Sequence, residues 1–166
     1  MDHEYFMTEA LQQAEAALNT GEFPVGCVVV HENRIIATGA REGSAGDCPN
    51  EVDHAEMVAL RRLISLKSSI NFREVTLYST LEPCLMCFGA LIINDIGKIV
   101  FAYEDAMGGG TRCDFTRLPP LYQEKQVSVV PNILRQKSLQ LLKAFFSNPE
   151  NIYLKGTLLA EYTLHQ

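Results

Sequence analysis

Residues 74–94 read EVTLYSTLEPCLMCFGALIIN, and this stretch decides the fold class. Its opening residues, 74–80, are rich in β-branched and aromatic side chains and predict a strand. The strongly apolar residues from Cys84 to Asn94 predict a helix that Pro83 can open. Residues 98–103 then predict a second strand. A strand, a helix and a strand in this order form a right-handed crossover unit, so the two strands are expected to pair in parallel.

The segments on either side extend the α/β pattern. Further predicted elements are helices at residues 4–19, 54–66 and 135–146 and strands at residues 25–30, 34–38 and 127–130. On the helix at 54–66, the predicted buried stripe consists of Met57, Leu60, Leu63 and Ile64. Asn148-Pro149-Glu150 has a capping residue followed by proline and predicts the start of one more helix. We expect a single domain over residues 1–166, in which the last ~15 residues have no assigned role.

Two short motifs contain three potential metal ligands. They are His54-Ala55-Glu56 and Pro83-Cys84-Leu85-Met86-Cys87. One imidazole and two thiolates match a zinc ion that has three protein ligands and a fourth position open to water. Glu56 adds a carboxylate beside that position, where it can accept and return a proton. We therefore predict one zinc ion per chain with a catalytic water, bound by His54, Cys84 and Cys87.

The spacing of these residues suits that chemistry. Cys84 and Cys87 are three residues apart, so both sulfurs can lie on one face of a helix. The N-terminus of a helix stabilises negative charge and therefore favours thiolates. The helix that begins near His54 is expected to start at the same edge of the sheet, where open α/β sheets place their sites. Glu56 is only two residues from His54, so the two side chains take different positions around the metal.

Two alternatives remain open for these cysteines. Cys48 lies six residues before His54 and could complete a closed, structural Cys₃His zinc site, which would leave Glu56 without a role. The C-x-x-C pair could instead be a redox dithiol, which would leave His54-Ala55-Glu56 unexplained. Cys27 and Cys113 are interpreted as a buried strand thiol and a loop thiol.

The composition disfavours a disulfide-rich, membrane-spanning or secreted protein. The chain has 166 residues, a formal net charge of -6 and five cysteines, an odd number that does not suggest a disulfide framework. No apolar run approaches the ~18 residues that a membrane span needs. The N-terminus lacks a secretory profile, because no Lys or Arg precedes Arg34. We expect a cytoplasmic protein without a membrane partner, and the negative charge disfavours a nucleic-acid substrate.

The chain resembles the cytidine deaminase superfamily, in its branch of bacterial tRNA adenosine deaminases and guanine deaminases. The resemblance rests on Phe23-Pro24-Val25-Gly26, His54-Ala55-Glu56, Thr80-Leu81-Glu82-Pro83-Cys84-Leu85-Met86-Cys87 and Ile96-Gly97-Lys98-Ile99-Val100-Phe101-Ala102. The resemblance implies a three-layer α/β/α fold with a mixed five-stranded sheet in the order 2-1-3-4-5, one catalytic zinc and a homodimer. It also implies that His54, Cys84 and Cys87 bind the zinc, and that Glu56 is the catalytic proton shuttle. The candidate substrate-binding residues are Phe23, Pro24, Val25, Arg41, Asp53, Ala55, Glu104 and Asp105.

The chain departs from the tRNA enzymes near the expected pocket. Gly39-Ala40-Arg41 stands where they typically carry Gly-Trp-Asn. Glu104 and Met107 stand where they typically carry Arg and Lys, which removes two positive charges that could attract a phosphate backbone. The predicted function is therefore zinc-dependent hydrolytic deamination of a small aminated heterocycle, such as a nucleobase or nucleoside, with release of ammonia.

Two other functions are alternatives. The first is deamination of the wobble adenosine of a tRNA. The second is a non-catalytic partner subunit with structural zinc, although such subunits typically lack the carboxylate that Glu56 supplies. The apolar helix predicted at residues 84–94, with Phe88, Leu91, Ile92 and Ile93, could provide either a homodimer face or part of the core.

Overall fold

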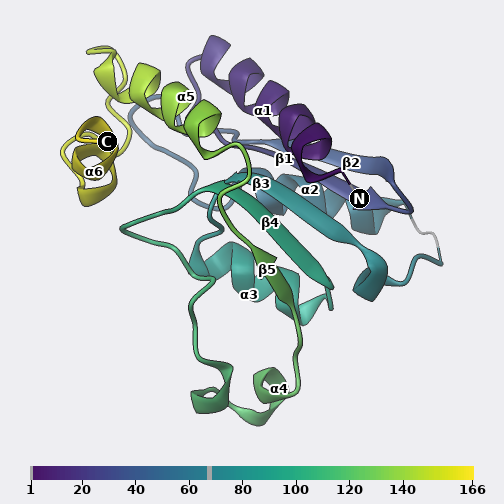
Figure 1. Cartoon of the computed structure of the whole chain (residues 1–166). Helices are drawn as coiled ribbons and strands as arrows, with labels where there is room; N and C mark the ends of the chain where they lie inside the picture. Colours follow the sequence, from purple (N-terminus) through teal and green to yellow (C-terminus); the bar gives the residue numbers. More distant parts are fainter. Residues whose placement is uncertain (1, 67–68) are drawn as a thin grey trace.

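The predicted strands form one five-stranded sheet in the order β2-β1-β3-β4-β5 (Figure 1). The computed structural model describes residues 2–66 and 69–166. β1 pairs in antiparallel orientation with β2 and β3, and β4 pairs in parallel with β3 and β5. The order confirms the predicted mixed sheet. The strands are β1 Gly26–His31, β2 Arg34–Ala40, β3 Thr76–Leu81, β4 Lys98–Tyr103 and β5 Ser128–Val130.

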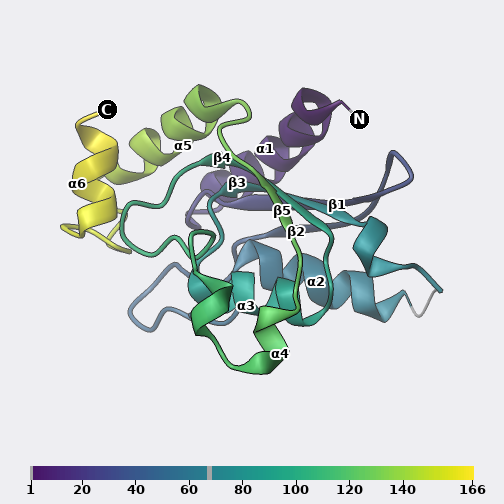
Figure 2. The same cartoon turned by 60° about the horizontal axis from the view of Figure 1, so that its bottom comes forward.

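Helices cover both faces of this sheet. They are α1 His3–Asn19, α2 Ala55–Ser65, α3 Leu85–Ile93, α4 Pro120–Gln123, α5 Arg135–Ser147 and α6 Leu158–Leu164. α1 and α5 lie on one face, and α2 and α3 lie on the other, which confirms the three-layer α/β/α prediction (Figure 2). Side chains of β1 alternate between the two layers. Val28 and Val30 join the apolar cluster of α1, whereas Cys27 and Val29 join the cluster that contains α2 and α3.

The directions of the strands bring α2 and α3 together. Because β1 runs antiparallel to both of its neighbours, β2 and β3 point in the same direction. α2 follows β2 and α3 follows β3, so both helices begin at the edge of the sheet where these strands end. Gly39 in β2 allows a close approach, since a Cβ atom there would lie 2.2 Å from the carbonyl oxygen of Ala55. The first turn of α2 therefore rests directly on β2.

The buried face of α2 differs from the predicted stripe. Leu60 and Leu63 are buried as predicted, but Ile64 is 48% exposed and Met57 is only partly buried. Ala59 is fully buried instead, because α2 contacts β2 beside Gly39 through its small residues. The close packing of backbone against backbone thus rotates the helix relative to its large apolar side chains.

The C-terminal region also differs from expectation. The predicted helix start at residues 148–150 is wrong, because Asn148 Oδ1 accepts the N–H of Glu150 at 3.0 Å within a turn. α6 begins only at Leu158, where the side chain of Thr157 caps it. It packs at the end of β4, where the hydroxyl of Tyr103 donates a hydrogen bond to Thr163 Oγ1 at 3.3 Å.

One side of α3 belongs to the core. Phe88, Leu91 and Ile92 are buried, whereas Ile93 is 49% exposed. The core interpretation of this helix is therefore right for three of the four apolar residues named in the prediction. Within residues 2–66 and 69–166, no helix has the length and apolar character needed to cross a membrane.

Candidate active site

His54 and Cys84 are the N-cap residues of α2 and α3, the helices that begin at the same edge of the sheet. Cys87 lies in the first turn of α3. Nδ1 of His54 lies 3.6 Å from Sγ of Cys84 and 3.6 Å from Sγ of Cys87. All three potential ligand atoms lie within 4.8 Å of one another. The structure therefore brings together the three residues that the sequence predicts as zinc ligands.

The separations between these atoms fit a zinc ion. Zinc lies about 2.3 Å from a thiolate sulfur and about 2.0–2.1 Å from an imidazole nitrogen, with tetrahedral angles. Sulfur and nitrogen ligands of one zinc ion are therefore roughly 3.6 Å apart. This is the separation of His54 Nδ1 from each thiol. Three such donors leave the fourth tetrahedral position for water or substrate.

The surroundings favour a thiolate at Cys84. Its pKa is lowered to about 4, chiefly because the Cys87 thiol donates a hydrogen bond to it, with a further contribution from His54. The pKa of Cys87 is raised, since this residue keeps the shared proton and is buried. The N-terminus of α3 adds positive potential at both sulfurs. The pair thus holds negative charge where a cation would bind.

Glu56, in the first turn of α2, is only 3% exposed and lies beside the ligand cluster. The hydroxyl of Ser79, from β3, donates a hydrogen bond to Oε1 at 3.2 Å. The other oxygen, Oε2, lies 3.6 Å from Sγ of Cys87. Burial raises the pKa of Glu56. A carboxyl group with a raised pKa can exchange a proton more readily near neutral pH than an exposed glutamate can.

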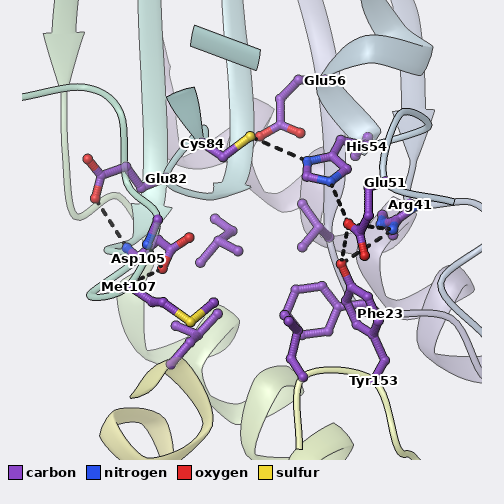
Figure 3. Close-up of a pocket in the computed structure, with 16 residues that line it drawn as sticks. Phe23, Arg41, Glu51, His54, Glu56, Glu82, Cys84, Asp105, Met107 and Tyr153 are labelled. Carbon is purple, nitrogen blue, oxygen red and sulfur yellow. Dashed lines mark hydrogen bonds and ion pairs between the residues drawn. The ribbon is translucent and has the colours of Figure 1, made fainter. Parts of the chain in front are cut away.

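A cavity of about 180 Å³ lies beside the cluster and Glu56 (Figure 3). Five of the predicted substrate-binding residues line it: Phe23, Val25, Arg41, Ala55 and Asp105. They come from the loop before β1, the end of β2, the start of α2 and the loop after β4. The fold therefore gathers them from four separate segments around one space.

Pro24, Asp53 and Glu104 are not among the residues that line the cavity. The carboxylate of Asp53 binds Asn50 and Arg61 instead. Glu104 forms an ion pair with Arg135, from Nε to Oε2 at 2.8 Å. The sequence predicts that Glu104 repels phosphate. This prediction is corrected here, because the positive charge of Arg135 balances the negative charge of Glu104.

The loop after β4 is held against the start of α3. Asp105 Oδ1 accepts the backbone N–H groups of Met107 and Gly108 at 2.9 and 2.8 Å. A Cβ atom at Gly109 would lie 2.5 Å from the carboxyl group of Glu82, so only glycine fits there. Glu82 Oε2 in turn accepts the N–H of Asp105 at 3.1 Å. These contacts place Asp105 and Met107 on the cavity wall.

Several residues that line the cavity are not among the candidates predicted from the sequence. They are Glu51, Leu81, Glu82, Gly108, Tyr153, Leu154 and Leu159. Met107, which the sequence comparison places near the expected pocket, also lines the cavity. Tyr153 packs its ring on Phe23, with ring centroids 5.4 Å apart, and lies 5.4 Å from the guanidinium of Arg41. The C-terminal segment thus forms one wall. The sequence signals this wall only through the apolar residues after Asn151. Those residues do not indicate that their partners, Phe23 and Arg41, lie more than a hundred residues earlier in the chain.

The alternative of a closed, structural Cys₃His zinc site requires Cys48 as the fourth ligand, and Cys48 does not lie near the other three residues. Cys48 is exposed, and the group of neighbouring ligand atoms found among the described residues contains only His54, Cys84 and Cys87. Cys27 is buried in β1, as predicted, and Cys113 is partly buried in the loop after β4. The geometry at the cluster is thus that of an open, three-ligand site.

A family model described as "Cytidine and deoxycytidylate deaminase zinc-binding region" matches residues 1–103. The chain belongs to the cytidine and deoxycytidylate deaminase family. It is therefore a zinc-dependent hydrolytic deaminase, which confirms the predicted enzyme class and metal. The matched region ends at the last residue of β4, so the C-terminal wall of the cavity lies outside it.

Curated relatives of this deaminase cover most of its length. The tRNA-specific adenosine deaminase of Bacillus subtilis (strain 168) is 34% identical over 146 residues, which is 86% of this chain and 88% of the relative. The tRNA-specific adenosine deaminase 2 of Xenopus tropicalis is 33% identical over 151 residues, or 85% of this chain and 86% of the relative.

Solved structures show the same fold. A structure from studies of A-to-I editing by tRNA:A34 deaminases has a TM-score of 0.67 and 27% identity, and the match covers 79% of this deaminase and 99% of that chain. A guanine deaminase from Nitrosomonas europaea has a TM-score of 0.66 and 22% identity, over 85% of this chain and 82% of that one. The second likeness concerns the fold alone.

Proposed function

We propose that this deaminase hydrolyses an exocyclic amine on a nucleobase ring to a carbonyl group and releases ammonia. In this proposal His54, Cys84 and Cys87 bind the zinc, and Glu56 transfers the protons. The observation that carries the proposal is the position of the buried Glu56 carboxylate. It lies 3.6 Å from Cys87 Sγ and lines the same cavity as His54 and Cys84.

Glu56 has two distinct oxygens for this task. Zinc bound at the cluster would supply a water molecule that loses a proton more easily than bulk water does. Glu56 Oε2 faces the cluster and can accept that proton, while Ser79 holds Oε1 at 3.2 Å. The protonated Glu56 can then deliver this proton to the ring nitrogen. It can next accept a second proton, from the hydroxyl group added to the ring, and deliver that one to the departing amine. Such general acid–base transfer typically contributes ~10²–10⁴-fold to the rate.

The cavity walls suit a flat ring. Phe23, Val25 and Leu81 supply apolar and aromatic surface, and Leu159 adds more from the C-terminal side. Its volume of about 180 Å³ is below the ≈ 300–1,000 Å³ that is typical of drug-sized ligands. We therefore propose that one base enters the cavity, and that the apolar walls exclude additional water from it.

We propose adenosine in a tRNA as the first substrate to test. The Bacillus subtilis and Xenopus tropicalis relatives are both tRNA-specific adenosine deaminases and match more than four-fifths of the chain. A base inside a nucleic acid would have to be extruded from its stack to reach Glu56, as in other base-modifying enzymes. The ion pair of Glu104 with Arg135 removes one argument against an RNA substrate.

A free base or nucleoside is the second candidate, and Met107 favours it. Met107 lines the cavity and is 45% exposed, so an apolar side chain lies where the resembled tRNA enzymes carry lysine. The net charge of -6 also lowers the affinity expected for a polyanion.

Ammonia release from zinc-loaded protein tests the proposal. The substrates are an anticodon stem-loop with adenosine at the wobble position and a panel of aminopurines, cytosines and their nucleosides. Inosine in the stem-loop, with a rate that falls steeply with salt, would establish the tRNA activity. Turnover of a free base alone would establish the second candidate. The proposal fails if no member of either set releases ammonia.

We also propose a homodimer. Leu85 and Ile93 of α3 are 64% and 49% exposed, and Met86 is 39% exposed. These three side chains place apolar surface on the outer side of a helix that otherwise belongs to the core. An apolar patch of this kind is typical of a protein contact surface.

A further inference from the structure

The carboxylate of Glu51 connects the zinc-ligand cluster with the C-terminal segment. Its Oε2 atom lies 3.4 Å from Nε2 of His54 and accepts a hydrogen bond from the Tyr153 hydroxyl at 2.9 Å. The same oxygen lies 3.5 Å from Nη2 of Arg41. Figure 3 shows these side chains converging on one side of the cavity, with His54 between Glu51 and Cys84. One carboxylate oxygen thus meets three partners from three different segments.

We propose that Glu51 is a positioning residue for His54, and that Tyr153 of the C-terminal segment holds Glu51 in place. The inference rests on the proposed role of His54 as a zinc ligand. Neither Glu51 nor Tyr153 would touch the reacting atoms, so both would act through the orientation of the imidazole ring. The C-terminal segment, which lies beyond the region matched by the family model, would then stabilise the metal site.

The two ring nitrogens of His54 face opposite ways. Nδ1 points to the thiols of Cys84 and Cys87 at 3.6 Å, so it is the nitrogen that can bind a metal. A neutral imidazole that binds metal through Nδ1 carries its proton on Nε2 and can donate it to Glu51. Histidine ligands commonly donate their second N–H to a carboxylate, and loss of that partner typically weakens metal binding about 10–100-fold.

Arg41 explains why Glu51 takes this position although it is 57% exposed. The side chain of Arg41 is only 2% exposed, and a buried guanidinium needs an anionic partner. Its Nη1 donates to the backbone carbonyls of Glu42 and Asp53, which fixes the guanidinium. Arg41 Nη2 also donates to the Tyr153 hydroxyl at 3.4 Å. Arg41 and Tyr153 therefore fix Glu51 from two sides and leave its oxygen next to His54.

Zinc affinity tests this inference without any substrate. Competition with a chromophoric chelator at constant pH would give the zinc dissociation constant of each variant. We expect Glu51→Ala to weaken zinc binding about 10–100-fold. Tyr153→Phe keeps the ring but removes the hydroxyl, so we expect a smaller loss of about fivefold, as for one hydrogen bond. Asp47→Ala, in the same exposed loop but outside the cavity, is the matched control and should bind zinc like the unaltered protein.

A double variant and a spectroscopic probe separate positioning from general destabilisation. If Tyr153 acts through Glu51, the loss in Glu51→Ala plus Tyr153→Phe will equal the loss in Glu51→Ala alone. With Co²⁺ in place of zinc, Glu51→Ala should shift the visible absorption bands, because the imidazole ligand is reoriented. Asp47→Ala should leave the bands unchanged.

Two results would overturn the inference. One is unchanged zinc affinity in Glu51→Ala, and the other is full additivity of the Glu51 and Tyr153 effects. Failure of the proposed ligand set would look different, because His54→Ala would then retain the affinity of the unaltered protein. The inference alone fails when His54→Ala loses zinc and Glu51→Ala does not.

Discussion

Arg135, at the start of α5, binds Glu104 at the end of β4 through two nitrogens, and Nε lies 2.8 Å from Oε2. Tyr162 of α6 donates its hydroxyl to the same carboxylate at 2.7 Å. This ion pair therefore joins the sheet to both C-terminal helices. Since α6 contributes Leu159 to the cavity, the pair also supports the cavity wall.

Glu104→Gln should destabilise the protein in a pH-dependent way. The pKa of Glu104 is lowered from 4.5 to about 2, chiefly by its hydrogen bonds with Arg135. Its stabilising contribution is therefore fully present above pH 4.5 and is lost as the pH falls toward 2. We expect the variant to lose about 1–3 kcal/mol of unfolding free energy at pH 7 and less at pH 3. Urea denaturation at both pH values measures this, and an equal loss at both would contradict the ion-pair explanation.

Glu56→Ala should abolish turnover while zinc remains bound. Removal of the carboxylate eliminates proton transfer, so we expect kcat to fall by at least ~10²–10⁴-fold. Metal analysis should still find one zinc per chain, because His54, Cys84 and Cys87 are unchanged. Ser79→Ala, which removes only the hydrogen bond to Oε1, should have a much smaller effect. Loss of zinc from Glu56→Ala would instead assign this residue a structural role.

Cys87→Ala and Cys48→Ala should have opposite consequences. Cys87 lies 3.6 Å from His54 Nδ1, whereas Cys48 is exposed. We expect Cys87→Ala to lose zinc and activity, and Cys48→Ala to keep both. Zinc content after dialysis and ammonia release would be measured for each. If Cys48→Ala lost its zinc, the site would be closed by a fourth sulfur and the catalytic proposal would be wrong.

Gly39→Ala should destabilise the protein, because the added methyl group would lie 2.2 Å from the carbonyl oxygen of Ala55. Relief of this clash requires α2 to move away from β2, at a cost of about 1–3 kcal/mol. Gly89 of α3 is the matched control, since a Cβ atom there would have no neighbour within 4 Å. Gly89→Ala should therefore leave stability unchanged or raise it slightly. Thermal and urea unfolding of both variants would reveal the difference.

Ile93→Glu should disrupt the proposed homodimer. Ile93 is 49% exposed on α3, so a charged side chain is tolerated in a monomer but not in an apolar interface. Sedimentation velocity at micromolar concentration should give a dimer for the unaltered protein and a monomer for the variant. A monomeric unaltered protein would contradict the proposal.

Local patterns were sufficient to predict the strands and the residues of the ligand cluster, whereas the order of the sheet was predicted only from the family resemblance. Periodicity marks each strand, and the two motifs place His54 and Cys84 at helix starts that the strand directions bring together. The orientation of α2 was predicted incorrectly because it depends on close packing of Ala59 beside Gly39, whereas periodicity weighs only large side chains. The helix start at Asn148 failed because the same residue type favours turns as well as caps.

Contacts between distant segments could not be predicted. Tyr153 meets Glu51 through a loop and a turn that have no repeating pattern, so nothing in either segment indicates the other. The charge of Glu104 was misinterpreted for the same reason, since Arg135 is its partner only in the folded chain. The proposed substrate-binding half of the site is made largely of such contacts, whereas the proposed metal-binding half comes from two contiguous motifs.

The common direction of β2 and β3 has a thermodynamic consequence. His54 comes after β2, and Cys84 comes after β3, and these two strands lie on opposite sides of β1 in the sheet. A metal ion bound by both residues would therefore act as a cross-link between the two parts of the sheet. An unfolded chain cannot offer this preorganised donor set, and metal affinity is therefore also resistance to denaturation. Each tenfold increase in the ratio of the free zinc concentration to the zinc dissociation constant adds about 1.4 kcal/mol to the free energy of unfolding. Zinc bound at this site would thus stabilise the folded protein as well as take part in its reaction.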